Sequence, residues 1–330
     1  MEIRWHHMSV ALAVFLGTNT AAVNAAVSPL RVAFPRHPAL RSAAPAPERD
    51  IFYYQTQYYN AQYQSLAPIW RHRDPTTHLP YVTDVMVAAF HLGYNTGGTP
   101  YIHLNDNVPS DPMFRVMWHE TAKLQRLGIT VRMMLGGAAQ GSYGDLFSNW
   151  STFYPILRHT LKRYDLNGID LDVEETVSLA DIERLISALN RDFGKSFIIT
   201  LSPVCSALWG GPNLSGFSYI DLYNGPEGPD IAWFNAQFYS GFGSLQNTTD
   251  YDHVLAGGEF PADKVVAGVI DNPNDGSGFV AISTLVTTLH ALTREHHNFG
   301  GVAGWEYFNA LPGGQANPNE FARIMAQAMR

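Results

Sequence analysis

A short run of alternating acidic and aliphatic residues constrains the fold of this chain more than any other feature. The acids alternate one by one with the aliphatic residues: Asp170, Asp172 and Glu174 with Ile169, Leu171 and Val173. In an extended strand neighbouring side chains point to opposite faces, so one face carries three carboxyl groups and the other is aliphatic. The same alternation is typical of a half-exposed antiparallel strand with its polar face in water. The rest of the sequence has to decide between these two interpretations.

The surrounding sequence predicts eight strands separated by helices. Short apolar or β-branched runs mark the strands, at residues 51–56, 85–91, 130–135, 168–173, 197–202, 232–239, 265–270 and 302–307. Amphipathic segments predict helices between several of them, at residues 113–127, 151–163, 179–193, 281–297 and 318–329. Eight β/α units in about 280 residues predict an α/β fold of the (β/α)8 or TIM barrel type. A doubly wound sheet is the alternative, although no glycine-rich phosphate-binding motif follows the first strand.

In a TIM barrel the two faces of the acidic strand would meet different surroundings. The outer face of a barrel strand lies under helices, which suits the aliphatic residues, and the inner face fills the lumen. Asp170, Asp172 and Glu174 would then face the lumen, where three buried acids are costly to keep without a chemical use. Glu174 would lie at the carboxyl end of its strand, at the rim where the active sites of these barrels form. The sequence therefore predicts an acid-based active site at this rim.

Residues near other strand ends are candidates for the same site. Asn235, Gln237 and Tyr239 share one face of the sixth expected strand, which becomes a polar inner face in a barrel. Trp305, near the end of the eighth strand, could form the floor of a sugar-binding site. The pair Gly136–Gly137 follows the third strand and would let a ligand or a loop approach the backbone closely. A glycine pair can also simply end a strand.

Composition and charge exclude several classes of partner. The 330 residues carry a net charge of −8 and no cluster of lysine and arginine, so nucleic acids and anionic membranes are not expected as partners. The single cysteine, Cys205, excludes an internal disulfide framework and a cysteine-based metal site. His103 lies among short polar residues typical of a turn, and His296–His297 ends a helical pattern. Neither is expected to bind a metal.

The chain begins with a pattern typical of a secretory signal. A basic residue precedes the apolar run 10–16 and small residues follow it, so we expect a signal peptide over residues 1–26. Residues 27–50 are rich in proline and lack periodicity, which predicts a linker or pro-segment before a catalytic domain at 51–330. No later segment is long enough to span a bilayer. A secreted, extracellular protein is expected, in agreement with three N-glycosylation sequons, at Asn149, Asn213 and Asn247.

The spacing of the acids predicts that they share protons. A strand rises by ~3.3 Å per residue, so the backbones of Asp172 and Glu174 lie ~6.6 Å apart. Two charges at that distance repel by roughly 2.5 kcal/mol at an effective dielectric constant of about 20. We expect a coupled titration of the three acids, with one proton kept near Glu174. A protonated acid at an open rim is what general-acid cleavage of a glycosidic bond requires.

At these positions the chain resembles glycoside hydrolase family 18. The family signature of the fourth strand, Asp-Gly-x-Asp-x-Asp-x-Glu, appears at residues 167–174 with Asn167 in place of the first Asp. The Ser-x-Gly-Gly motif of the third strand appears at residues 134–137 with Met134 in place of Ser. The Gln-x-Tyr of the sixth strand and the Trp of the eighth match the positions of Gln237, Tyr239 and Trp305.

Within the family the chain is most similar to the fungal endo-β-N-acetylglucosaminidases of the mannosyl-glycoprotein type. The similar stretches are residues 90–92, 102–106, 135–139, 170–174, 213–219, 237–243 and 304–309. The resemblance implies cleavage of the diacetylchitobiose core of high-mannose N-glycans, with the substrate acetamido group as nucleophile. Glu174 would protonate the departing oxygen, and Asp172, aided by Asp170, would orient the acetamido group. The other implied site residues are Tyr239 on the acetamido carbonyl and Gln237, Trp305, Gly136 and Gly137 along the substrate.

The resemblance leaves alternatives open. A chitinase needs the same 2-acetamido sugar, but Val173 replaces the aromatic residue often found before the acid in chitinases. Only 31 residues separate Ile270 from Val302, too few for the insertion domain of many chitinases, so a single catalytic domain without it is expected. A sugar-binding lectin on the same barrel is a further alternative. The resemblance implies no metal and no organic cofactor. The expected partner is an N-acetylglucosamine-containing glycan, and a monomer is expected because nothing in the sequence suggests an obligate protein partner. Branch preference is expected to depend on loops near 93–112, 138–150 and 206–228.

Overall fold

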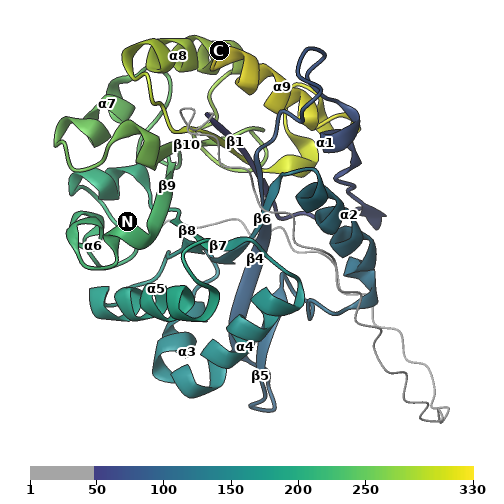
Figure 1. The fold of residues 1–330 in the computed structure, drawn as a ribbon, viewed down its shortest axis with the longest axis vertical. Helices are drawn as coiled ribbons and strands as arrows, with labels where there is room; N and C mark the ends of the chain where they lie inside the picture. Colours follow the sequence, from purple (N-terminus) through teal and green to yellow (C-terminus); the bar gives the residue numbers. More distant parts are fainter. Residues whose placement is uncertain (1–47) are drawn as a thin grey trace. The chain divides into compact units, whose positions relative to one another are not determined.

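Eight parallel strands close into a barrel in the computed structural model, which describes residues 48–330 (Figure 1). In order around the ring they are β1 (Arg49–Tyr54), β4 (Asp84–Tyr94), β6 (Thr130–Gly136), β7 (Gly168–Asp172), β8 (Ile198–Leu201), β9 (Ile231–Gln237), β10 (Val265–Ile270) and β11 (Gly301–Trp305). β1 pairs in parallel with both β4 and β11, which closes the ring. The predicted TIM barrel is confirmed, and the doubly wound alternative is excluded.

Helices surround the strands, as Figure 1 shows, and the five that were expected are present. They are α2 (Arg115–Arg126), α4 (Trp150–Arg163), α5 (Leu179–Phe193), α8 (Ile282–Glu295) and α9 (Asn319–Ala328). Four shorter helices were not predicted: α1 (Ala67–Arg71), α3 (Ser142–Ser148), α6 (Tyr219–Asn224) and α7 (Thr249–Ala256). Five to eight residues span at most about two helical turns, which is too short for a periodic apolar pattern to stand out.

α5 illustrates why the long helices form where the sequence predicts them. The Ser178 hydroxyl accepts a hydrogen bond from the backbone N–H of Asp181 (3.1 Å), which caps the first turn. Ile182, Leu185 and Leu189 lie on one helical face, and all three are fully buried. Gly194, with φ of +80°, ends the helix in a backbone conformation that favours glycine.

The aliphatic and acidic faces of β7 meet different surroundings, as the barrel requires. Ile169, Leu171 and Val173 belong to the large apolar core between the barrel and the helices. A second, smaller apolar cluster fills the lumen and includes Ile51, Met86, Met134, Trp233, Val266 and Ala303. The acids on the inner face of β7 therefore lie on top of a packed lumen, not in a water-filled channel.

A buried ion pair forms part of the base of this lumen. The Arg132 guanidinium is fully buried and donates to Asp84 Oδ1 (3.0 Å). It also lies 4.3 Å from the ring centre of Trp233 and donates to the hydroxyl of Thr200 (3.1 Å). A buried charge is tolerated only when it is paired and hydrogen-bonded, and these contacts meet both conditions.

An antiparallel hairpin extends one side of the rim and was not expected. β4 continues to Tyr94, four residues beyond its last parallel pairing with β6, at Phe90. Its extension pairs with β5 (Pro100–Leu104), with His91 opposite His103 and Gly93 opposite Tyr101. A second small ribbon, β2 (Tyr58–Tyr59) with β3 (Gln62–Tyr63), follows β1.

The domain boundaries can be compared with the structure only in part. The expected signal peptide and residues 27–47 of the expected linker lie outside the described residues. β1 begins at Arg49, two residues before the expected strand, because Arg49 and Asp50 pair with Gly301 and Val302 of β11. Between β10 and β11 the described chain contains α8 and no separate insertion domain. None of the helices in residues 48–330 combines the length and apolar character that crossing a bilayer requires.

Candidate active site

The three acids of the alternating run lie at the carboxyl end of the barrel. Asp170 and Asp172 are on the inner face of β7 and are 0% and 5% exposed. Glu174 follows the strand and is half-buried at the rim. The three acids therefore lie one above another, from Asp170 next to the packed lumen to Glu174 near solvent.

Asp170, the most deeply buried of the three acids, accepts four hydrogen bonds from neutral side chains. The donors are Tyr53 (2.8 Å), Thr200 (2.5 Å), Ser202 and Asn235 (2.9 Å). Together they use the acceptor sites of an ionised carboxylate. Met134, which replaces the Ser of the family motif, belongs to the apolar cluster of the lumen. Two of the three hydroxyl donors, Thr200 and Ser202, come instead from β8 and its carboxyl end.

Gln237 joins the upper two acids. One N–H of its side-chain amide donates to the carbonyl of Ser202 (2.8 Å), and the other is shared between Asp172 Oδ1 (3.1 Å) and Glu174 Oε1 (3.2 Å). Burial, followed by the charges of Glu174 and Asp170, raises the pKa of Asp172 well above its usual range. Burial also raises the pKa of Glu174. The arrangement favours retention of one proton within the upper pair of acids.

A small cleft lies beside these acids, and we call it the acid cleft. Its lining includes Asp172, Gln237, Tyr239 and Trp305. The Trp305 ring is half-buried and packs at 5.6 Å, centre to centre, on the ring of Tyr53. Burial and the charges of the acids raise the pKa of Tyr239 well above 10, so its phenol keeps its proton and can donate to a ligand. The acid cleft thus combines an aromatic wall with hydrogen-bonding groups, as a sugar site requires.

The glycine pair at the end of β6 allows its backbone to approach that of β7 closely. Gly136 and Gly137 have φ values of +95° and +96°, a region that favours glycine. A Cβ atom on Gly136 would lie 2.3 Å from the carbonyl oxygen of Asp172 and 2.6 Å from the Tyr143 ring. The backbone N–H of Gly137 donates to the same carbonyl (2.9 Å). The pair therefore positions the strand that carries the acids.

Two residues that the sequence did not single out fix the backbone at Glu174. Gln140 donates from its side-chain amide to the Glu174 carbonyl (2.8 Å). The Glu175 carboxylate accepts the backbone N–H groups of Gly141 (3.0 Å), Tyr143 (2.9 Å) and Gly144 (3.3 Å), at the start of α3. An anion at a helix N-terminus is favourable because it meets unpaired N–H groups and the positive end of the helix dipole.

The structure brings together all eight predicted site residues and adds several more. Tyr53, Thr200 and Ser202 were missed, although Tyr53 occupies an inward position of the first expected strand, two residues from Ile51. The acid next to Glu174 was visible in the sequence, but nothing in the pattern showed which helix Glu175 would cap. Asn235 was expected on the inner face of its strand, and it is there.

The three sequons differ in their surroundings. Asn149 and Asn247 are exposed. Asn213 is also exposed, but its side-chain amide donates to the carbonyl of Phe217 (2.6 Å). The hydroxyl of its sequon serine, Ser215, is buried and donates to the carbonyl of Val173 (2.6 Å).

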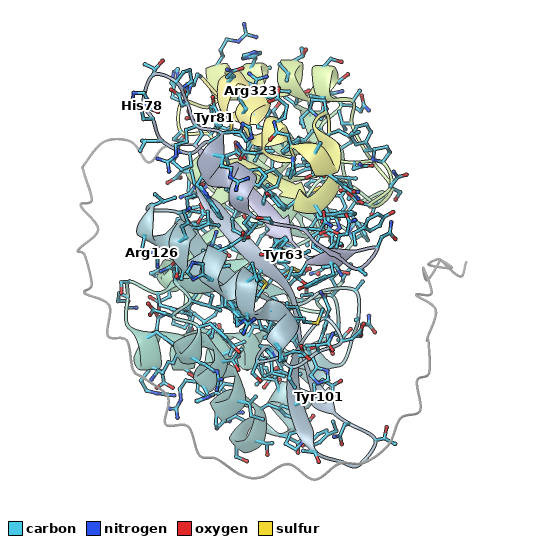
Figure 2. The ribbon with its side chains drawn as sticks, turned by 90° about the vertical axis from the view of Figure 1, so that its right-hand side faces the viewer. Tyr63, His78, Tyr81, Tyr101, Arg126 and Arg323 are labelled. Atoms are coloured by element: carbon cyan, nitrogen blue, oxygen red, sulfur yellow. The ribbon has the colours of Figure 1, made fainter. Side chains whose placement is uncertain are left out.

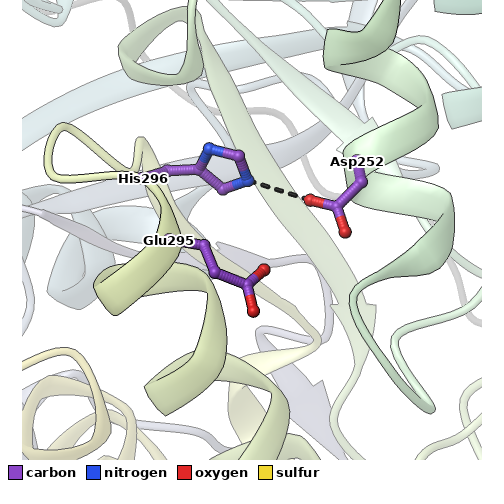
Figure 3. Close-up of side chains that lie close together, drawn as sticks. All are labelled: Asp252, Glu295 and His296. Atoms are coloured by element: carbon purple, nitrogen blue, oxygen red, sulfur yellow. Dashed lines mark hydrogen bonds and ion pairs between the residues drawn. The ribbon is translucent and has the colours of Figure 1, made fainter.

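One group of side chains in residues 48–330 has the composition of a metal site. Potential ligand atoms of Asp252, Glu295 and His296 lie within 4.8 Å of one another (Figure 3). His296 Nε2 and Asp252 Oδ1 are 2.9 Å apart, and this contact joins α7 to the end of α8 in the helix layer outside the barrel. The contact gives His296 a structural role, and the acids of β7 lie on a different part of the fold.

Known structures with this architecture identify the family. The structure of a fungal endo-β-N-acetylglucosaminidase from glycosyl hydrolase family 18 is 44% identical in sequence, with a TM-score of 0.78. The similarity covers 86% of this chain and 98% of that protein. The chain belongs to glycoside hydrolase family 18. The resemblance of its four strand-end motifs to this family is thereby confirmed.

Family 18 relatives of this chain include both endo-β-N-acetylglucosaminidases and chitinases. The chitinase ChiC from Aspergillus fumigatus is 41% identical, with a TM-score of 0.74, over 86% of this chain and all of that protein. Chitinase 2 from Rhizopus oligosporus is 26% identical over 267 residues, which cover 73% of this chain. The matching segment spans about half of that chitinase, 47% of its length. No family model matches the chain.

Proposed function

We propose that this protein is a secreted, retaining glycosidase that cleaves the β-1,4 bond in the diacetylchitobiose core of high-mannose N-glycans. The observation that carries the proposal is the shared amide of Gln237, which holds Asp172 and Glu174 together beside Trp305 and Tyr239. A protonated acid above a second acid, next to an aromatic wall, suits cleavage at a 2-acetamido sugar. The 44% identity with a fungal endo-β-N-acetylglucosaminidase supports the choice of substrate.

The first chemical step would use Glu174 as general acid. Its raised pKa keeps a proton available at the rim, and this proton passes to the glycosidic oxygen as the bond from that oxygen to the anomeric carbon breaks. The carbonyl oxygen of the substrate acetamido group attacks the anomeric carbon from the opposite face, which forms an oxazolinium ring. Tyr239 would donate a hydrogen bond to this acetamido group, and Trp305 would support the sugar ring from below.

In the second step Glu174 would act as a general base. Ionised Glu174 takes a proton from a water molecule, whose oxygen attacks the anomeric carbon and opens the oxazolinium ring. Two inversions at the same carbon give net retention. Asp172 would stabilise the positive charge on the oxazolinium, since it lies below Glu174 on the same strand and not across the cleft. Asp170, held by four donors, would fix the position and the charge state of Asp172 from below.

Secretion and a monomeric state remain part of the proposal. The apolar N-terminal segment and the exposed sequons Asn149 and Asn247 support export.

A chitinase is the second candidate function, favoured by the 41% identity with the Aspergillus fumigatus chitinase and by the Rhizopus oligosporus relative. Ribonuclease B, which carries high-mannose N-glycans, and colloidal chitin separate the two activities. We expect the purified protein to release glycans from ribonuclease B, detected by mass spectrometry of the product, faster than sugars from chitin. Turnover of chitin without release of glycans would overturn the proposed substrate.

A further inference from the structure

A second hollow lies on the rim beside the acid cleft and plays no part in the proposed chemistry. It is formed by the β4–β5 hairpin and the loop after β6. We call it the hairpin pocket. The lining residues used below are His91, Tyr101, His103, Asp106, Gln140 and Ser142. In Figure 2 Tyr101 is labelled near the end of the extended strands.

One wall of the hairpin pocket is a stacked aromatic pair. The rings of Tyr101 and His103 lie 4.0 Å apart, centre to centre, with planes only 16° from parallel. The pair depends on a glycine on the facing strand, because a Cβ on Gly93 would lie 2.6 Å from the Tyr101 hydroxyl oxygen and 2.8 Å from its ring. Gly93 leaves the space into which the phenol extends. Flat aromatic surfaces of this kind pack against the C–H face of a pyranose ring.

The remaining lining groups are polar and mostly uncharged. Burial lowers the pKa values of both His91 and His103, so their rings are neutral near pH 7. His91 Nδ1 lies 3.4 Å from the Ser142 hydroxyl, and Asp106 supplies one acid at the edge of the pocket. Neutral rings, a hydroxyl and one carboxylate offer both donors and acceptors, which suits a ligand rich in hydroxyl groups.

The hairpin pocket is connected to the acid cleft through one side chain. Gln140 lines the pocket and also donates to the Glu174 carbonyl (2.8 Å). Around the barrel the strand order β7, β6, β4 leaves only β6 between the acids and the hairpin. A ligand in the hairpin pocket would therefore lie to the side of a sugar whose glycosidic bond reaches Glu174.

We propose that the hairpin pocket binds a neutral pyranose on a branch of the glycan whose core occupies the acid cleft. The inference rests on the proposed function and deepens it, because a side pocket serves a branched substrate and not a linear chain. Tyr101 and His103 would pack against the sugar ring, and His91, Asp106 and Ser142 would bind its hydroxyl groups.

Binding of a branched α-mannopentaose to the full-length protein tests the hairpin pocket without catalysis, since this probe contains no N-acetylglucosamine. Ligand-observed NMR titration would compare wild type, Tyr101→Ala, His103→Ala and the matched control Thr96→Ala, an exposed residue at the tip of the same hairpin. We expect a loss of affinity of about ten-fold for Tyr101→Ala, equivalent to about 1.4 kcal/mol, and unchanged affinity for the control. If thermal unfolding shows that Tyr101→Ala is misfolded, the affinity of His103→Ala for mannopentaose tests the proposal in its place.

Kinetic measurements then test the pocket assignment independently of the proposed function. For the two pocket variants we expect kcat/KM to fall by about ten-fold on a high-mannose glycopeptide and by less than two-fold on linear chitotetraose. Absence of mannopentaose binding to wild type, unchanged binding by both pocket variants, or equal loss on both substrates would overturn the pocket assignment. A wild-type protein that binds mannopentaose through Tyr101 but releases no N-glycan would leave the pocket assignment standing and overturn the proposed function.

Discussion

Removal of the Glu175 carboxylate is expected to impair catalysis although this group does not touch the substrate. Of its three backbone donors, only the Tyr143 N–H belongs to a buried residue, so water can replace the bonds to Gly141 and Gly144 in Glu175→Ala. Loss of one charge-assisted bond costs about 1.5–3 kcal/mol, and the lost interaction with the helix dipole adds about 0.3–1 kcal/mol. We therefore expect the free energy of unfolding to fall by about 2–4 kcal/mol.

This loss corresponds to a fall in Tm of roughly 4–16 °C, at about 2–4 °C per kcal/mol for a domain of this size. Because Glu174 precedes Glu175 directly, release of α3 also displaces the proposed acid, and a displacement of ~1 Å can cost about 100-fold in rate. We expect kcat for Glu175→Ala to fall by about 10- to 100-fold with little change in KM. Glu175→Gln keeps one acceptor for two of the N–H groups, so its kcat should fall by less than about five-fold.

Differential scanning calorimetry and initial rates of glycan release would measure both effects. Glu295→Ala is the matched control, because it removes an exposed carboxylate from the end of α8 in the outer helix layer (Figure 3). A Glu175→Ala protein with the Tm and kcat of the control would refute the view that Glu175 positions the neighbouring acid.

Three further perturbations follow from the described contacts. Glu174→Gln should retain glycan binding by calorimetry and lower kcat by at least about 1,000-fold, and a rate near wild type would show that another group donates the proton. Gly136→Ala should lower the free energy of unfolding, measured in urea, by about 1–3 kcal/mol more than Gly141→Ala. Both positions have positive φ, but only a Cβ at Gly136 meets the Asp172 backbone, and equal losses would contradict this. Burial raises the pKa of Glu306 to about 7. The unfolded chain, with a pKa near 4.5, then loses its proton first, and this acid removes roughly 3 kcal/mol of stability as pH rises from 4.5 to 7. In urea titrations at several pH values, the free energy of unfolding of Glu306→Gln should fall less between pH 4.5 and 7 than that of wild type. An equal fall in both proteins would assign the pH dependence to another group.

The sequence predicted the barrel because its strands and long helices leave strong periodic signals. The alternation in β7 defined two faces, and the apolar spacing in α5 defined one, so the position of the acids followed from geometry alone. The family resemblance supplied the roles that geometry does not give, such as that of the substrate acetamido group.

Most of the parts that the sequence did not predict depend on contacts between distant segments. The β4–β5 hairpin is local and its glycine-containing turn, Asn95 to Thr99, is typical of hairpins, but it was missed because the expected strand ended at His91 and no strand was expected after it. The role of Glu175 depends on a helix of seven residues that has no periodic signature of its own. Hydroxyl donors to Asp170 come from β1 and β8, and only the closed ring brings them to the same acid.

The loop that contains Asn213 carries a consequence for how this protein matures. The hydroxyl of Ser215 donates to the carbonyl of Val173, directly before the proposed acid, and the side-chain amide of Asn213 donates to the carbonyl of Phe217 within the loop. Because both side chains are engaged in the folded loop, attachment of a glycan at Asn213 competes with folding of this segment. We expect host glycans on Asn149 and Asn247 and an unmodified Asn213, which leaves the packing behind the acids undisturbed during export.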